Sequence, residues 1–430
     1  MTGPQAEGGI QVEDRKIYED IALRTEGDIY IGVVGPVRTG KSTFIKRFME
    51  TMVIPNIENV YRRERARDEL PQSGSGRTIM TAEPKFVPEE AVTVSMEGGG
   101  AFQVRLIDCV GYMVTGAVGQ LEGEEERMVT TPPYTAYLKI AEGCSNGCAF
   151  CIIPKLRGRY RSRTMDSLLR EARELEARGT KELIVIAQDI TRYGLDLKDG
   201  SSLAGLLKEL CKLDFHWIRL HYLYPEVITD ELIDVIAHEK KIVHYLDIPI
   251  QHCNDRILKA MRRHNTRQEL EELFAKLRSA IPDVVLRTSL ICGLPGETDE
   301  EFEELCEFLR EQKLQRAGVF QFSPEEGTRA ARMDHVDMEE ARRRAELVVD
   351  VQSDIIDAYN DSILGEEREV LCEGFDGQAQ MHFGRSYAES PDIDGRIWFD
   401  ANREVEPGTF VTVRLTGVMD GELTGELAEE

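Results

Sequence analysis

The chain has 430 residues and a formal net charge of −25 at pH 7, with 41% hydrophobic and 30% charged residues. This length predicts about two to four domains, and the apolar content is high enough for buried cores, which excludes gross disorder. Because so negative a chain repels nucleic-acid phosphates, nucleic acid is not expected as a direct substrate.

Three further features concern the compartment. The sequence has no run of about 18 apolar residues, so no membrane span is expected. The first residues, "MTGPQAEGGIQVEDRK", lack a basic region followed by an apolar one, and no secretory signal is predicted. Nine cysteines, an odd number, favour reduced thiols and metal binding over disulfides. The expected location is therefore the cytoplasm.

The first motif lies in "DIYIGVVGPVRTGKSTFIKRFME", which predicts a strand, a glycine loop and a helix. Gly35, Gly40, Lys41 and Ser42 fit G-x-x-x-x-G-K-[ST] in full. The glycines let backbone N–H groups approach phosphate oxygens, Lys41 would reach the β- and γ-phosphates, and Ser42 would hold Mg²⁺. The motif predicts a Mg-ATP site, with a helix from Ser42 to about Met52.

A second strand, Val104–Gly111 ("VRLIDCVG"), places Asp108 at an apolar strand's end. Asp108 could be the second carboxylate on the Mg²⁺ side, and Asp108-x-x-Gly111 is similar to the γ-phosphate sensor of GTPase-like folds. The alternative is a strand-end aspartate with a purely structural role.

Three stretches, "GPVRTGKSTFIKRFME", "DELPQSGSGRTIMTAEPKFVP" and "LIDCVGYMVTGAVGQ", closely resemble the ATPase region of the stage IV sporulation protein A family. The resemblance covers nearly all of residues 10–131. It implies an ATP-hydrolysing, self-polymerising protein of the spore coat. The later strands of the P-loop fold have no counterpart, so residues 1–131 are expected to form a partial P-loop NTPase domain.

The next motif is Cys144-x-x-x-Cys148-x-x-Cys151, which follows a predicted strand at 134–142. Three thiolates at this spacing can hold three irons of a four-iron–four-sulfur cluster and leave the fourth iron open. Radical SAM enzymes use this arrangement. S-adenosylmethionine chelates the open iron, and an electron from the cluster cleaves the S–C bond of S-adenosylmethionine to give a 5′-deoxyadenosyl radical. The alternatives are a zinc knuckle, which lacks a fourth ligand at short range, and buried free thiols.

Apolar strands recur through residues 132–364 and alternate with amphipathic helices. This alternation predicts a parallel sheet with right-handed crossovers, an open (βα)6 partial barrel whose site lies at the carboxyl ends of the strands. The expected strands are 134–142, 183–189, 217–225, 245–251, 285–293 and 317–327, and two expected helices are 164–179 and 297–312.

Several polar residues end these strands and are predicted contacts for S-adenosylmethionine or substrate. For each, a loop-capping role is the alternative. They are Gln188, Asp189, Gln251, Thr288 and Ser289. The remaining thiols show no ligand spacing and are expected to be ordinary buried cysteines: Cys211, Cys253, Cys292, Cys306 and Cys372.

Motifs across residues 132–430 resemble the RimO-type methylthiotransferases: "TPPYTAYLKIAEGCSNGCAFCIIPKLRGRYRSR", "IAQDITRYGLDL", "YLDIPIQHCNDRILKAMRR", "RTSLICGLPGET" and "VFQFSPEEGT". These enzymes attach a methylthio group to an aspartate of a small-subunit ribosomal protein. The tRNA methylthiotransferases of the MiaB kind are the nearest relatives. With the one cysteine triad present, the resemblance implies one four-iron cluster with an open iron site, S-adenosylmethionine, an electron donor protein and a basic ribosomal protein as substrate.

The tail, residues 365–430, alternates apolar and polar residues between glycine turns, which predicts a small antiparallel β-barrel. It resembles a TRAM domain of the RimO-like form, with "FGRSYAESPDIDG" as the matching stretch. From Gly365 onward it has five arginines, no lysine and sixteen acidic residues. Such a surface repels phosphate and attracts a basic protein. A merely solvated acidic surface is the alternative.

The two resemblances overlap at Thr130–Pro132. RimO-type enzymes carry three further cysteines in an N-terminal domain, for a second cluster, whereas only Cys109 precedes Cys144 here. A join at a short shared sequence is what recombination, misassembly or template switching would produce, so we interpret the chain as a chimera of two fragments. The expected function is a radical SAM methylthiotransferase, and the alternative is an ATP-dependent spore-coat assembly protein.

Overall fold

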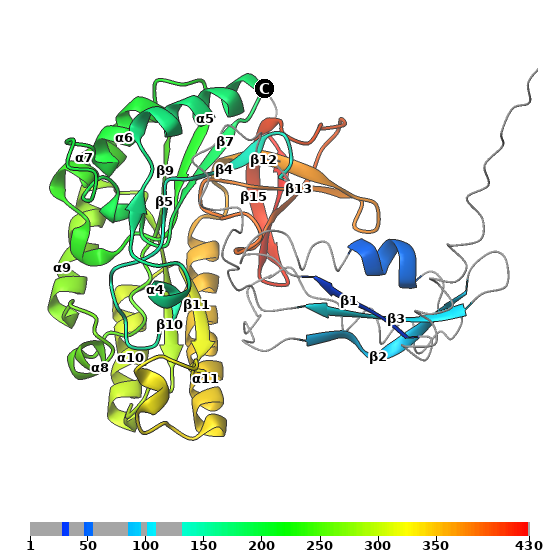
Figure 1. The fold of residues 1–430 in the computed structure, drawn as a ribbon. Helices are drawn as coiled ribbons and strands as arrows, with labels where there is room; N and C mark the ends of the chain where they lie inside the picture. Colours follow the sequence, from blue (N-terminus) through cyan, green and yellow to red (C-terminus); the bar gives the residue numbers. More distant parts are fainter. Residues whose placement is uncertain (1–27, 34–46, 55–84, 96–100, 109–130, 429–430) are drawn as a thin grey trace, which may run out of the picture. The chain divides into compact units, whose positions relative to one another are not determined.

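The computed structural model describes residues 28–33, 47–54, 85–95, 101–108 and 131–428 (Figure 1). The chain divides into two compact units. The first comprises Met1–Ser73 and Thr81–Ala117, and the second Gly74–Met80 and Val118–Glu430.

The first unit contains a three-stranded sheet in the order β1-β3-β2. Strand β1 (Asp28–Val33) pairs in parallel with β3 (Ala101–Asp108), and β2 (Lys85–Ser95) pairs antiparallel with β3. The register places Asp108 beside Val33, two residues before Gly35, the first residue of the predicted glycine loop. A short π-helix, η1 (Met49–Val53), coincides with the end of the predicted helix.

The second unit is built on six parallel strands in the order β11-β10-β9-β8-β7-β4. This confirms the predicted open parallel sheet. The strands are β4 (Thr135–Lys139), β7 (Glu182–Ile186), β8 (Trp217–Leu220), β9 (Ile242–Asp247), β10 (Val285–Cys292) and β11 (Arg316–Gln321). The helices between and after them are α4 (Ile153–Leu156), α5 (Met165–Ala177), α6 (Leu203–Leu210), α7 (Asp230–His238), α8 (Asp255–Ala260), α9 (Arg267–Ala280), α10 (Asp299–Gln312) and α11 (Met338–Ser362), with short 3-10 turns η3 (Ile190–Arg192), η4 (Pro225–Val227) and η5 (Ala330–Arg332).

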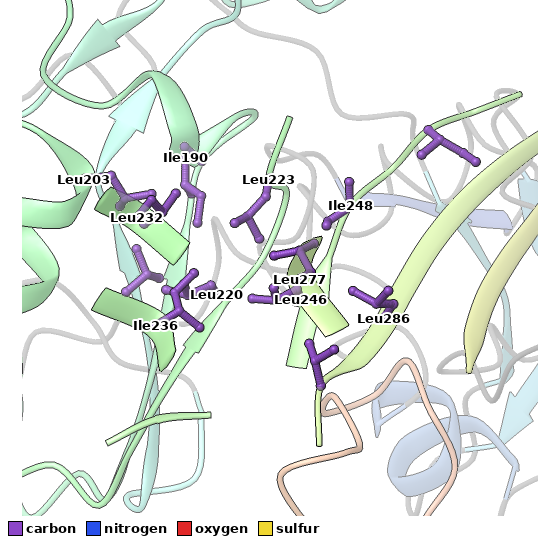
Figure 2. Close-up of a cluster of buried hydrophobic side chains, with 14 of the residues drawn as sticks. Ile190, Leu203, Leu220, Leu223, Leu232, Ile236, Leu246, Ile248, Leu277 and Leu286 are labelled. Carbon is purple, nitrogen blue, oxygen red and sulfur yellow. The ribbon is translucent and has the colours of Figure 1, made fainter. Parts of the chain in front are cut away.

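The main core lies between this sheet and its helices. Figure 2 shows Leu220, Leu246 and Leu286 of three neighbouring strands close to Ile236 of α7 and Leu277 of α9. All five are at most 1% exposed. Burial of each such side chain contributes about 1.5–3 kcal/mol. This packing holds the carboxyl ends of the strands at one edge, where the predicted site should lie.

The last element group is a closed barrel in the order β12-β13-β14-β16-β15. The expectation of an antiparallel barrel is correct except for β14 and β16, which pair in parallel. Five strands closed into a ring cannot alternate direction all the way round, so one neighbouring pair must be parallel. The strands are β12 (Glu367–Asp376), β13 (Met381–Arg385), β14 (Ile397–Asp400), β15 (Phe410–Met419) and β16 (Glu422–Leu427). In the part of the chain with described structure, no helix is long and apolar enough to cross a membrane.

Candidate metal centre

The loop with the three spaced cysteines begins after β5 (Ala141–Glu142), which pairs with β6 (Arg161–Ser162). The backbone N–H of Cys144 donates to the Gly158 carbonyl at 3.2 Å. Gly143 adopts φ +79°, and a Cβ there would lie 2.3 Å from the Arg159 carbonyl oxygen. Only glycine allows this close approach of the two backbone segments.

The second half of the loop is held by backbone bonds to distant segments. The N–H of Ala149 donates to the Met261 carbonyl, and the N–H of Ala330 donates to the Ala149 carbonyl, both at 2.9 Å. The N–H of Cys151 donates to the Cys148 carbonyl at 3.1 Å. Ala149 itself is buried in a small apolar cluster with Met261 and Ala330. The spacing of the three thiols is therefore set by the fold rather than by a free loop.

All three thiols are free and partly exposed. Burial raises the pKa of the Cys151 thiol to about 11, with smaller contributions from the neighbouring Cys148 and Cys144. Burial also raises the pKa of Cys144, and Cys148 adds to that effect.

These residues fit an iron–sulfur cluster by the chemistry of their donors. Three thiols from one loop suit a four-iron cluster, which takes each cysteine at a separate corner. Structural zinc sites take four ligands around one ion. Among the residues that the structure describes, no three His, Cys, Asp or Glu side chains meet as a single metal ion would require.

Asp189, one of the predicted strand-end residues, ties the cysteine loop to the end of β7. Its carboxylate accepts from Asn146 Nδ2 at 2.8 Å and pairs with Arg192 Nε at 3.2 Å. It also accepts from the Thr191 N–H at 3.0 Å. Asp189 thus positions the loop, while Gln188 beside it is half-buried and its Oε1 has no partner among the described residues. Of the two, Gln188 is the one with a free polar atom.

The remaining predicted strand-end residues are placed differently: Thr288 and Ser289 lie inside β10, and Gln251 lies four residues beyond the end of β9. The hydroxyl of Thr288 is fully buried, donates to the Ile248 carbonyl at 2.8 Å and accepts from the Ile250 N–H at 3.2 Å. The Thr288 side chain therefore has the loop-capping role that was the alternative to a ligand contact. Ser289 is half-buried, and its carbonyl accepts from the N–H of Gln251, which adopts φ +72°.

Sequence reasoning missed two residues at the cysteine loop. The Tyr224 hydroxyl lies 3.6 Å from Cys148 Sγ, and Arg263 Nη1 lies 3.9 Å from the same atom. Burial raises the pKa of the Tyr224 phenol, which keeps it a hydrogen-bond donor at neutral pH. They lie 76 and 115 residues from Cys148 in the chain, and no local spacing signals the contact.

The predicted ATP-binding residues Gly35, Gly40, Lys41 and Ser42 lie outside the described residues. Asp108 is described as the last residue of β3, beside Val33. Of the thiols expected to be buried, Cys253, Cys292, Cys306 and Cys372 are buried, whereas Cys211 is only half-buried.

Three family models match the chain. The radical SAM superfamily matches residues 138–309, and the TRAM domain matches residues 364–428. The ATPase domain of stage IV sporulation protein A matches residues 12–153, so this match overlaps the radical SAM match at residues 138–153.

Two curated relatives are similar to more than two thirds of the chain. Ribosomal protein uS12 methylthiotransferase RimO of Caldanaerobacter subterraneus subsp. tengcongensis is 48% identical over 302 residues, which are 70% of this chain and 69% of the relative. The enzyme of the same name from Thermoanaerobacter sp. is 47% identical over 303 residues, again 70% and 69%.

Among solved structures, the radical S-adenosylmethionine methyltransferase TsrM of Kitasatospora setae, with cobalamin and a [4Fe-4S] cluster bound, aligns with a TM-score of 0.41 and 16% identity. The alignment covers 72% of this chain and 67% of TsrM. At this level of similarity no functional conclusion follows.

Proposed function

The chain belongs to the family of RimO-type ribosomal protein uS12 methylthiotransferases, and we propose that it is a radical SAM enzyme that attaches a methylthio group to an aspartate of a small-subunit ribosomal protein. The observation that carries the proposal is the loop of Cys144, Cys148 and Cys151, fixed at the carboxyl edge of a six-stranded parallel sheet. Open α/β sheets bind ligands at this edge.

The three cysteines would hold a four-iron cluster, which when bound supplies the electron that cleaves S-adenosylmethionine. An electron donor protein would reduce it. Asp189 orients the loop through Asn146. Gln188 and Ser289 are the proposed contacts for S-adenosylmethionine or substrate, and Thr288 supports them by holding the segment after β9.

The acidic C-terminal barrel supports a basic protein substrate. Arginines of the barrel already pair with carboxylates of the chain. Arg385 is buried against Glu182 of the sheet and Glu373, and Arg414 pairs with Glu367. The excess carboxylates therefore dominate the barrel's surface, which attracts a basic protein and repels phosphate. Since the substrate is part of the ribosome, the proposed location is the cytoplasm.

The test is anaerobic reconstitution of the purified chain with iron and sulfide. We expect about four irons per chain and reductive cleavage of S-adenosylmethionine. Cys148→Ala should lose both, whereas Cys211→Ala, which removes a half-buried thiol remote from the loop in sequence, should keep both. A chain without iron, or iron content unaffected by Cys148→Ala, would refute the proposal.

Cleavage of S-adenosylmethionine needs only the first cluster, whereas methylthiolation also needs a source of sulfur. The chimera interpretation places residues 1–131 where the family carries the ligands of a second cluster. With a small-subunit ribosomal protein as substrate, cleavage should therefore proceed, while methylthiolation should be weak or absent. Strong methylthiolation, or about eight irons per chain, would contradict this part of the proposal.

A specific observation favours a second candidate function, ATP binding by the first unit. The parallel register of β1 and β3 puts Asp108 beside Val33, two residues before Gly35, where the P-loop motif begins. A Mg²⁺-side carboxylate requires this neighbourhood of the two strand ends. We expect Mg-ATP binding that Lys41→Ala abolishes and Lys46→Ala, outside the motif, does not. Equal binding by wild type and Lys41→Ala would exclude the candidate.

A further inference from the structure

Cys148 has two buried neighbours, Tyr224 and Arg263, neither of which was predicted as a site residue. Tyr224 is 5% exposed and Arg263 6%. The guanidinium of Arg263 lies over the Tyr224 ring, 4.1 Å from its centroid, an arrangement typical of a cation–π contact. Both side chains also reach Cys148 Sγ, the tyrosine with its hydroxyl at 3.6 Å and the arginine with Nη1 at 3.9 Å.

The backbone holds this pair in place. Arg263 Nη2 donates to the Pro249 carbonyl at 2.6 Å, which fixes the guanidinium to the segment after β9. The N–H of Tyr224 donates to Thr191 Oγ1 at 3.3 Å, which fixes the tyrosine to η3. Within the described part of the chain, no carboxylate forms an ion pair with Arg263, and its Nε has no partner. Its positive charge is therefore not neutralised beside the sulfur.

Resting on the proposed function, we infer that Tyr224 and Arg263 raise the reduction potential of the cluster that Cys148 would ligate. A hydrogen bond from a phenol and a nearby cation both stabilise the extra negative charge that one-electron reduction places on the cluster and its sulfurs. The electron comes from a low-potential one-electron donor, no covalent bond changes, and the phenol keeps its proton. Tyr224 and Arg263 would thus act on the cluster through Cys148 and would not themselves react.

The experiment is a redox titration of the reconstituted chain with dithionite and mediators, followed by electron paramagnetic resonance of the reduced cluster. Tyr224→Phe removes the hydroxyl and keeps the ring under Arg263. We expect the ratio of reduced to oxidised cluster at a fixed potential to fall about tenfold, which is a shift of about 59 mV to lower potential. Arg263→Gln, which removes the charge and keeps a donor for Pro249, should shift it in the same direction.

Tyr193→Phe is the matched control. Tyr193 is also a buried phenol, 1% exposed, and its hydroxyl has no partner among the described residues. This variant should keep the wild-type potential. Unshifted potentials in both test variants at four irons per chain, or loss of iron from both while they remain folded, would overturn the tuning role. A wild type that binds no iron would overturn the proposed function itself, and the inference with it.

Discussion

At the residue scale, Gly143 sets the start of the cysteine loop, and we expect Gly143→Ala to displace it. The substitution adds a φ penalty of about 1 kcal/mol at φ +79° and a clash with the Arg159 carbonyl that costs about 1–3 kcal/mol more. Iron content after reconstitution should fall well below that of the wild type. Gly179→Ala, at φ +87° with open space around the added methyl, should cost only about 1 kcal/mol and keep full iron content. Equal iron content in both variants would contradict the argument.

His252 predicts a pH dependence of stability. Burial lowers its pKa to about 4; Glu301 opposes this, and Arg256 and Arg344 add to it. Glu297 lies 3.6 Å from its Nε2, and burial raises the pKa of that carboxyl. Because the unfolded chain protonates His252 at a higher pH than the folded chain, stability is complete above pH 6.5 and falls towards about pH 4.

The expected loss across this window is about 3 kcal/mol at most. Urea denaturation at a series of pH values would measure it. His252→Gln should flatten the dependence above pH 5, where few carboxylates titrate, and an unchanged slope in that variant would assign the dependence to other groups.

The cysteine spacing predicted its loop from sequence because all three thiols lie within eight residues. Tyr224 and Arg263 could not be predicted in this way, since only the crossovers between strands bring them to Cys148. Thr288 was predicted at a strand end but lies in the middle of β10. Its sequence context also does not say whether its hydroxyl faces a ligand or a neighbouring backbone.

At the scale of elements, helices were predicted more closely than strands. The expected helices at 164–179 and 297–312 correspond to α5 (Met165–Ala177) and α10 (Asp299–Gln312). Their amphipathic period and capping threonines are local signals. Strand β8 was expected to reach Pro225 and ends at Leu220. Its apolar run continues, but the N–H of Leu223 turns to donate to the Asp247 carbonyl, and no apolar pattern reveals that.

The capping box of α9 permits a test at this scale. The Thr266 side chain accepts from the Glu269 N–H, and the Glu269 carboxylate accepts from the Thr266 N–H. We expect Thr266→Ala to lower the free energy of unfolding by about 1 kcal/mol. Thr266→Ser, which keeps the accepting oxygen, should change it by much less in the same urea titration. Equal losses in the two variants would show that the methyl group, not the cap, stabilises the helix.

At the scale of the whole second unit, a buried charge network joins the sheet to the C-terminal barrel. Glu182 at the start of β7 is fully buried and bonds Arg219 of β8 at 2.9 Å and Arg385 of β13 at 2.7 Å. Burial alone would raise the pKa of Glu182, but the two guanidinium groups outweigh it and lower the pKa to about 2. Arg316 of β11 pairs with Glu389 of the barrel in the same way. The sequence marks the barrel as a separate module, yet these contacts predict that it unfolds together with the sheet.

The only two tryptophans of the chain allow this to be measured, because Trp217 lies in β8 and Trp398 in β14. In Trp398→Phe the fluorescence reports Trp217, which lies where the sheet meets the barrel, 4.7 Å from the Phe410 ring. In Trp217→Phe it reports the barrel, and we expect both denaturation curves to coincide. Glu182→Ala should lower stability by about 3–5 kcal/mol in both, since it leaves the buried Arg219 without a carboxylate and removes one of the two carboxylates that pair with Arg385. Glu369→Ala breaks the exposed pair with His216, which also joins sheet and barrel, and should cost at most about 1 kcal/mol. If the curves separate in the wild-type background, the barrel folds on its own and the network is not what anchors it.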